Sequence, residues 1–195
     1  TRALERSHAP RLIGGTKARV TVSDELDFQS AASLAAAMRR RELSPIELCE
    51  YALDRIDRLD PGLHAFRLMD ADGARRSAYA ADQALRRGED VGPLHGVPYA
   101  TKDLLDVAGL PTSAGSNALG AMPAPANAEV THRLARAGLV LVGKTHTVEF
   151  AFGSVGINHS QGTPRNPWQR EPHVPGGSSS GSAVSILGRS VTPSW

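Results

Sequence analysis

One stretch near the end of the sequence reads Pro175-Gly176-Gly177-Ser178-Ser179-Ser180-Gly181-Ser182-Ala183-Val184. A flexible linker would continue in glycine and serine, whereas this stretch gives way to small apolar residues that can begin a helix. Glycines let the backbone take positive φ angles and approach another backbone closely. Serine hydroxyls and successive N–H groups can then line the space that is formed. The stretch therefore predicts a tight loop that packs against another part of the chain.

A second stretch ends in a lysine and an aspartate: Gly96-Val97-Pro98-Tyr99-Ala100-Thr101-Lys102-Asp103. The run 97–101 predicts a short buried strand with Lys102 at its exit. Most lysines are solvated loop cations. A lysine beside an apolar strand can instead lose its hydration, which lowers its pKa and makes the neutral amine available as a base. Lys102 is therefore a candidate catalytic base.

The two stretches resemble the signature loop and the lysine motif of the amidase signature family. These are serine hydrolases that include relatives of the A subunit of glutamyl-tRNA(Gln) amidotransferase. The segment 109–116 is similar to the part of that family which helps form the substrate cleft, and the similarity runs from about Ser44 to Val184. The resemblance implies hydrolysis of carboxylic amide C–N bonds through an acyl-enzyme and a triad of serine, cis-serine and lysine. It implies no cofactor.

The resemblance also assigns roles to particular residues. It implies that Lys102 is the triad base and that Ser178 is the bridging serine in a cis peptide, passing a proton between Lys102 and the nucleophile. The remaining residues of the loop are expected to shape it or to contact substrate; they are Gly176, Gly177, Ser179 and Ser180. In the family the nucleophilic serine lies farther on, in a Gly-Thr-Asp-x-Gly-Gly-Ser-type motif, which does not follow Val184 here. We therefore expect a chain truncated before the nucleophile and inactive by itself.

The expected fold is α/β, the N-terminal part of the amidase signature fold, with a mixed β-sheet covered by helices. A second apolar run, Leu139–Val142, predicts another buried strand. Ser44-Pro45-Ile46-Glu47 predicts a capped helix that Asp60-Pro61-Gly62 ends, and Asn127 is expected to cap a helix that Gly138 ends. We expect a mobile lead-in over 1–27, the amidase part over 28–184 and a divergent tail over 185–195.

A competing motif covers Gly138-Leu139-Val140-Leu141-Val142-Gly143-Lys144-Thr145, which satisfies the Walker A pattern. A phosphate-binding loop must have free backbone N–H groups, whereas Leu-Val-Leu-Val favours a strand whose N–H groups are paired. We therefore expect a strand here. No metal site is expected either, since the histidines are scattered without the spacing of a ligand set; they include His95, His132, His146, His159 and His173.

Composition limits the remaining classes. Hydrophobic residues make up 41% and charged residues 22%, with a formal net charge of +2, which is ordinary for a globular protein. The one cysteine, Cys49, is expected to be a buried thiol. We expect a cytoplasmic protein with a small-molecule amide substrate, no direct contact with nucleic acid or membrane, and a homodimer as one open assembly. The alternatives are an amidotransferase A-type subunit that releases ammonia from glutamine, and a non-catalytic binding remnant.

Overall fold

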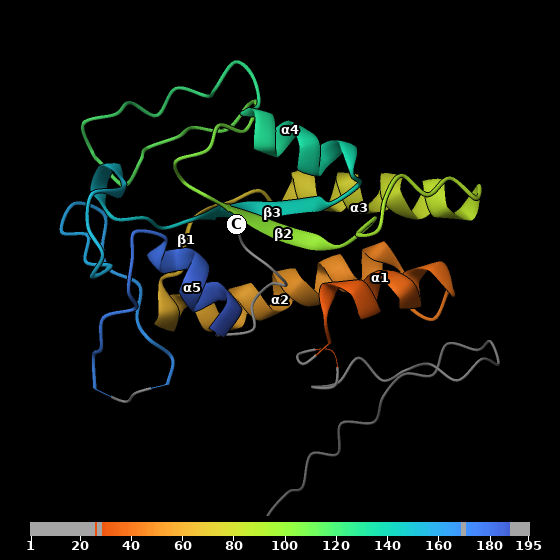
Figure 1. Cartoon of the computed structure of the whole chain (residues 1–195), viewed down its shortest axis with the longest axis horizontal. Helices are drawn as coiled ribbons and strands as arrows, with labels where there is room; N and C mark the ends of the chain where they lie inside the picture. Colours follow the sequence, from red (N-terminus) through yellow and green to blue (C-terminus); the bar gives the residue numbers. More distant parts are fainter. Residues whose placement is uncertain (1–25, 27–28, 169–170, 188–195) are drawn as a thin grey trace, which may run out of the picture.

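A mixed three-stranded sheet forms the centre of the structure, a computed structural model that describes residue 26, residues 29–168 and residues 171–187. Its strands are β1 (Phe66–Met69), β2 (Pro98–Lys102) and β3 (Val140–Thr145), in the order β1-β3-β2. Strand β3 runs parallel to β2 and antiparallel to β1 (Figure 1). Both predicted buried strands are confirmed, and so is the prediction of an α/β fold with a mixed sheet.

Helices cover both faces of this sheet. In the described residues they are α1 (Ala31–Arg39), α2 (Pro45–Leu63), α3 (Ala71–Arg86), α4 (Glu129–Arg136), η2 (Glu149–Ala151) and α5 (Ser180–Leu187). Helices α2 and α5 lie on one face, and α4 lies on the other (Figure 1). Helix α2 also packs along α3, and buried residues of both helices belong to the same core cluster.

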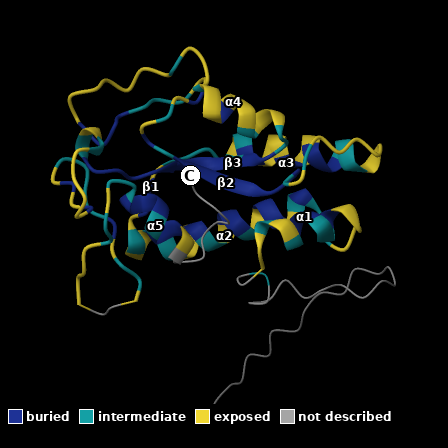
Figure 2. Cartoon of the chain, in the orientation of Figure 1, coloured by how far each residue is buried: buried dark blue, intermediate teal, exposed yellow. Residues whose placement is uncertain are grey.

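The main core lies between α2, α3, α5 and the sheet. Helix α3 packs closely against α2 and β3 because the small residues Ala74 and Ala78 lie on its inward side. Both residues are almost completely buried. Cys49 of α2 belongs to the same cluster, and burial raises the pKa of its thiol to about 11. Strands β2 and β3 are buried along most of their length, and β1 is buried at Phe66, whereas the outer sides of the helices are exposed (Figure 2).

Strand β3 contains one residue more than β2 opposite it. Tyr99 pairs with Leu141, but the next residue, Ala100, pairs with Gly143, so Val142 is left without a partner in β2. Such a bulge shifts the alternation of side chains between the two faces. A Cβ atom on Gly143 would lie 2.4 Å from the carbonyl oxygen of Leu68, which explains why a glycine stands there.

Helix α2 begins as predicted and ends later than predicted. Ser44 and Glu47 form the reciprocal capping box. The helix does not stop at Asp60-Pro61-Gly62 but continues to Leu63, with Pro61 inside its last turn. His64 then takes a left-handed conformation with φ 55 and donates its N–H to the Asp60 carbonyl.

Helix α4 has a different start from the one predicted. Asn127 does not cap it, because the Asn127 side chain accepts a hydrogen bond from the Ala108 N–H at 2.7 Å instead. Ala128 occupies the N-cap position without a side-chain hydrogen bond. Gly138 follows the helix with φ +79, as expected of a residue that ends it.

The predicted lead-in and the predicted tail lie largely outside the described residues. The lead-in 1–27 falls outside the described residues except for Leu26, and the tail 185–195 does so from residue 188 onward. Within the described part, no helix combines the length and the apolar character needed to cross a membrane.

Candidate active site

Lys102 and Ser178 meet at the end of β2, although 76 positions separate them in the sequence. Lys102 is the last residue of β2, and Ser178 lies in the serine loop (residues 175–179) that precedes α5. The Lys102 Nζ atom donates a hydrogen bond to Ser178 Oγ at 2.8 Å. Both residues are half-buried. The two residues that the resemblance links by proton transfer are therefore in direct hydrogen-bond contact.

Ser178 is held by its backbone as well as by Lys102. The peptide bond between Gly177 and Ser178 is cis, as the resemblance implied. The Ser178 carbonyl oxygen accepts hydrogen bonds from the Val148 N–H and from Thr147 Oγ1, each at 3.0 Å. Thr147 and Val148 lie two and three residues after the end of β3 and are buried, so the segment that follows the sheet fixes the position of Ser178.

The glycines of the serine loop allow a close approach between two chain segments. Gly177 donates its N–H to the Ser154 carbonyl at 2.8 Å. Gly156 lies so near that a Cβ atom on it would be 2.2 Å from the carbonyl oxygen of Gly176, and its φ is +91. Gly156 and Gly176 are both in the left-handed region that favours glycine.

Burial sets the electrostatic character of Lys102. The pKa of its amine lies below its usual range because burial disfavours the charged form. Deprotonation of Lys102 is therefore easier than for a solvated lysine. His146, just after β3, follows the same rule, since burial lowers its pKa to about 3. Its Nδ1 atom has no hydrogen-bond partner among the described residues.

Ser179 and Ser180 lie at the start of α5. The Ser179 carbonyl accepts a hydrogen bond from the Ala183 N–H in the first turn of the helix. Ser180 is fully buried, and its Oγ atom has no hydrogen-bond partner among the described residues. Of the serines in the loop, Ser178 is thus the one that the structure brings to Lys102.

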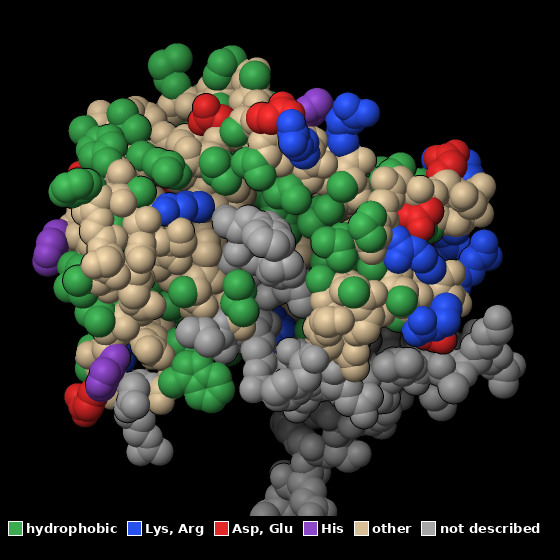
Figure 3. Space-filling view, viewed as in Figure 1, with side chains coloured by type: hydrophobic (Ala, Val, Ile, Leu, Met, Phe, Trp, Pro, Cys, Tyr) green, Lys and Arg blue, Asp and Glu red, His purple; other side chains and the backbone are tan. Residues whose placement is uncertain are grey.

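The segment after β3 exposes large apolar side chains beside the serine loop. In the stretch 149–157 they are Phe150, Phe152, Val155 and Ile157, with exposed fractions of 53%, 93%, 52% and 38%. Charged side chains gather instead over α4 and at the ends of α1 and α3 (Figure 3). The side of the molecule next to Ser178 is therefore comparatively apolar.

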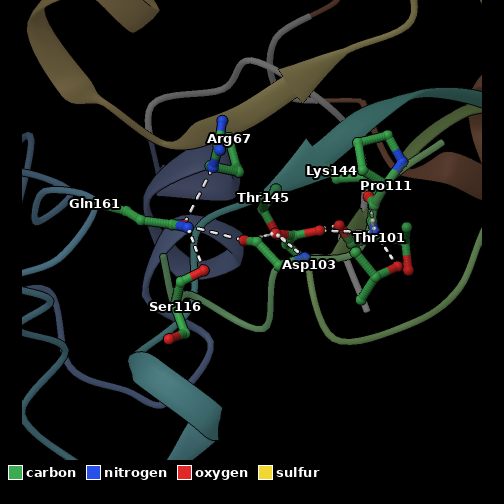
Figure 4. A network of polar contacts seen from close by, with 10 residues as sticks. Arg67, Thr101, Asp103, Pro111, Ser116, Lys144, Thr145 and Gln161 are labelled. Carbon is green, nitrogen blue, oxygen red and sulfur yellow. Dashed lines mark hydrogen bonds and ion pairs between the residues drawn. The ribbon is translucent and has the colours of Figure 1, made fainter. Parts of the chain in front are cut away.

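The sequence analysis did not predict a buried ion pair between Lys144 and Asp103, which lies on the face of the sheet opposite to Lys102. Lys144 Nζ lies 2.6 Å from Asp103 Oδ1, and neither side chain has more than 3% of its surface exposed (Figure 4). Lys144 therefore cannot serve a phosphate-binding loop, and residues 140–145 form a strand as predicted. The signal was present, because a lysine inside an apolar strand must find a partner.

The ion pair belongs to a larger network that ties three loops together. Gln161 donates to the Ser116 carbonyl at 3.0 Å and accepts from Arg67 Nε at 3.1 Å (Figure 4). Asn158, which is also buried, donates to the carbonyls of Gly115 and Thr147 at 2.7 and 2.8 Å. Through Thr147 this network reaches the residues that hold Ser178.

Two cavities in the described part of the chain are lined by residues other than Lys102 and Ser178. A space of about 550 Å³ lies between α1, the start of α2 and the end of α3, and is lined by Arg39, Glu47 and Asp82 among others. A smaller one of about 120 Å³ adjoins Asp103 and Gln161. The described residues contain no group of three histidine, cysteine, aspartate or glutamate side chains that could hold a metal ion.

These features define an α/β protein with a lysine–serine pair at the end of a parallel strand. The family whose sequence pattern matches the chain is described as Amidase, and the match covers residues 47–193. The chain belongs to this family. The predicted relationship to amidases and to the A-type component of amidotransferases is confirmed.

Individual relatives support the same assignment. The chain is 46% identical over 159 residues to a 2-amino-5-chloromuconic acid deaminase of Comamonas testosteroni, covering 81% of this chain and 34% of that protein. It is 45% identical over 162 residues to the A subunit of glutamyl-tRNA(Gln) amidotransferase from Acidothermus cellulolyticus, covering 83% and 32%. The structure of a peptide amidase from Stenotrophomonas maltophilia matches with a TM-score of 0.74 and 38% identity, covering 81% and 34%. The chain thus spans about a third of the length of the relatives it matches.

Proposed function

We propose that this chain carries the base and the proton-relay serine of an amide-hydrolysing site, with Lys102 as the base and Ser178 as the relay. The observation that carries the proposal is the 2.8 Å hydrogen bond from Lys102 Nζ to Ser178 Oγ, in a chain of the amidase family. Support also comes from burial, which lowers the pKa of Lys102 and so favours the neutral amine that a base requires. Gly176, Gly177, Ser179 and Ser180 shape the loop around this pair.

The proposed reaction moves one proton along a chain of three groups. A serine nucleophile attacks the carbonyl carbon of the amide while its hydroxyl proton passes to Ser178 Oγ. Ser178 passes its own hydroxyl proton to the neutral amine of Lys102 at the same time. The C–N bond breaks as a proton returns through Ser178 to the leaving nitrogen, which departs as an amine or ammonia. Water then hydrolyses the acyl-enzyme through the same relay.

We further propose that residues 1–195 do not hydrolyse amides by themselves. No Gly-Gly-Ser motif follows Val184 in this sequence, so the proposal assigns no nucleophile within it. Nucleophilic catalysis needs the attacking group, its base and oxyanion donors together, and each oxyanion donor is worth roughly 10²–10³ in rate. Purified chain assayed on aliphatic and aromatic amides should match Lys102→Ala. Hydrolysis that disappears in Lys102→Ala would contradict this part and indicate a substitute nucleophile.

A chimera tests the roles of Lys102 and Ser178. Residues 29–187 would replace the matching third of the peptide amidase from Stenotrophomonas maltophilia. We expect amide hydrolysis by the chimera and a loss of roughly 10²–10⁴ in kcat for Lys102→Ala and for Ser178→Ala. Ser33→Ala, which alters a partly exposed serine of α1, is the matched control and should leave kcat unchanged. Full activity in the Lys102→Ala chimera would remove the proposed base.

A second candidate is an amidotransferase A-type subunit that releases ammonia from glutamine. It is favoured by the 45% identity to the amidotransferase protein from Acidothermus cellulolyticus, which nearly equals the 46% to the deaminase. Ammonia release from glutamine, compared with release from simple amides, separates the two candidates in the same chimera. A chimera that is folded and binds amides without hydrolysing them would favour a non-catalytic binding remnant. The homodimer and the cytoplasmic location stay predictions.

A further inference from the structure

Asp103, the residue directly after Lys102, is fixed by all of its polar groups. Its N–H donates to the Thr145 carbonyl at 3.0 Å, and its carbonyl accepts from the Ala114 N–H at 2.9 Å. Its carboxylate accepts hydrogen bonds from the Ser113 N–H at 3.1 Å and from Ser113 Oγ. The remaining carboxylate oxygen pairs with Lys144. The exit of β2 is thereby held in one conformation.

Lys144 is equally well satisfied. An ammonium group has three N–H donors. Three acceptors lie within reach of Nζ: Asp103 Oδ1 at 2.6 Å, Thr112 Oγ1 at 2.6 Å and the Pro111 carbonyl at 2.8 Å (Figure 4). Buried charges are tolerated when they are paired and fully hydrogen-bonded, and Lys144 meets both conditions.

The ion pair and the Lys102–Ser178 pair lie on opposite faces of the sheet. Lys144 pairs with Thr101 in the register and Thr145 pairs with Lys102, so the side chains of Lys102 and Lys144 point to opposite sides. The Thr145 hydroxyl, on the face of Lys102, contacts Ser182 of α5 at 2.8 Å. The bulge at Val142 is what turns Lys144 away from the main core and toward Asp103.

The described surroundings of Lys102 carry few other charges. Helix α5 has no titratable side chain between Ser180 and Ile186. The titratable side chains that β3, the segment after it and the inner side of α2 contribute are Lys144, His146, Glu149 and Cys49. Cys49 and His146 are uncharged at neutral pH, because burial raises the pKa of the first to about 11 and lowers that of the second to about 3. With Glu149 set aside, an unpaired Asp103 carboxylate would therefore be the negative charge that stands next to Lys102 in the chain.

We propose that Lys144 is a positioning residue for Lys102: it fixes and neutralises the Asp103 carboxylate, and thereby holds the Lys102 amine against the Ser178 hydroxyl. A carboxylate without its cation would stabilise the charged form of the neighbouring amine and oppose its use as a base. With Lys144 in place, burial remains the cause that shifts the pKa of Lys102. The proposal rests on the proposed role of Lys102 as base, but its test reads the amine itself.

The test measures how fast acetic anhydride modifies Lys102 between pH 6 and pH 11, with the modified peptides quantified by mass spectrometry. The sequence has three lysines, and Lys17 serves as the reference in every sample. Lys144→Met leaves Asp103 unpaired, so we expect the modification rate of Lys102 at pH 8 to fall about tenfold, which corresponds to a pKa raised by about one unit. Asp103→Asn leaves Lys144 unpaired and should change the rate in the opposite direction.

The double variant Asp103→Asn/Lys144→Met removes both charges and should return Lys102 to within about threefold of the wild type. Arg133→Met, which removes a cation from an exposed ion pair on α4, is the control and should change nothing. If one single variant fails to fold, the proposal is tested by the other two proteins. The remaining single variant must change the modification rate of Lys102 in the expected direction, and the double variant must restore it. Single variants that leave the titration of Lys102 unchanged, or shift it in the same direction, would overturn the proposal. A chimera that does not hydrolyse amides would contradict the proposed function, but it would not contradict the effect of Lys144 on the Lys102 amine.

Discussion

Lys102 and Lys144 are neighbours across two paired strands, yet their environments differ in every respect. Lys144 is fully enclosed and has a carboxylate and two neutral oxygens as acceptors. Lys102 is half-buried and donates to one neutral hydroxyl. The first environment supplies the acceptors of a buried ion pair, whereas burial in the second lowers the pKa of Lys102. The sheet thus separates an enclosed, ion-paired lysine from a half-buried lysine to which we assign proton transfer only as a proposal.

The comparison predicts its largest effect at Lys144. Lys144→Met should lower the free energy of unfolding by about 3–5 kcal/mol, because it leaves the Asp103 carboxylate buried without its cation. Urea unfolding measures the change. The double variant Asp103→Asn/Lys144→Met should lose less than the single one, since it leaves no unpaired charge. A single variant as stable as the wild type would mean that the ion pair is not needed for the fold.

A smaller effect is expected where the serine loop meets the segment after β3. Gly156→Ala should cost about 2–3 kcal/mol, because its Cβ would press on the Gly176 carbonyl and φ is +91. It should also disturb Ser178, two residues beyond Gly176, and so change the modification rate of Lys102. Gly62→Ala is the matched control, since a Cβ there meets nothing within 4 Å and alanine suits a helix better than glycine. Equal stability of the two variants would contradict the close approach.

The pH dependence of stability tests the burial of His146. Its pKa is about 3 in the folded chain and about 6.5 in the unfolded chain, so between these values the unfolded chain binds the extra proton. Stability is therefore lost as pH falls through 6.5, by about 2 kcal/mol at pH 5 relative to pH 8. In His146→Gln this part of the loss should be absent, which urea unfolding at both values would show. Identical pH profiles in the two proteins would contradict the buried neutral histidine.

Much of the fold follows from local patterns in the sequence. The apolar runs at 97–101 and 139–142 are short and lie between turn residues, and both form strands. The capping box at Ser44 and Glu47 starts α2 where expected, because its hydrogen bonds involve only nearby residues. Lys102 was identified from its position at the end of an apolar strand and from a resemblance, and Ser178 from the resemblance. The hydrogen bond between them is present, but their catalytic roles stay predictions.

The features that were missed depend on contacts between distant residues. Nothing local in the sequence reveals that Val142 is an extra residue in the register, and this bulge decides which way Lys144 points. The same holds for Asn127, a good helix cap by type, whose side chain is engaged by the Ala108 N–H from a distant segment. The helix expected to end at Asp60-Pro61-Gly62 ends at Leu63, and the Asp60 carboxylate accepts hydrogen bonds from the N–H groups of Ala65 and Phe66 just beyond it.

The smallest effect is expected at Lys102, which sharpens the comparison because the substitution is the same as at Lys144. Lys102→Met removes one hydrogen bond to Ser178, worth about 1 kcal/mol, and also removes an ammonium group that burial destabilises. The two changes oppose each other, so the free energy of unfolding should shift by less than about 0.5 kcal/mol at pH 7. The folded-state pKa of Lys102 is lowered, so the unfolded chain holds this proton more firmly and the wild type should gain stability as pH rises. Any advantage of Lys102→Met should therefore shrink toward pH 10, which urea unfolding at pH 7 and pH 10 would measure. A loss at Lys102 as large as the loss at Lys144 would show that the two lysines are equally structural and would end the distinction between them.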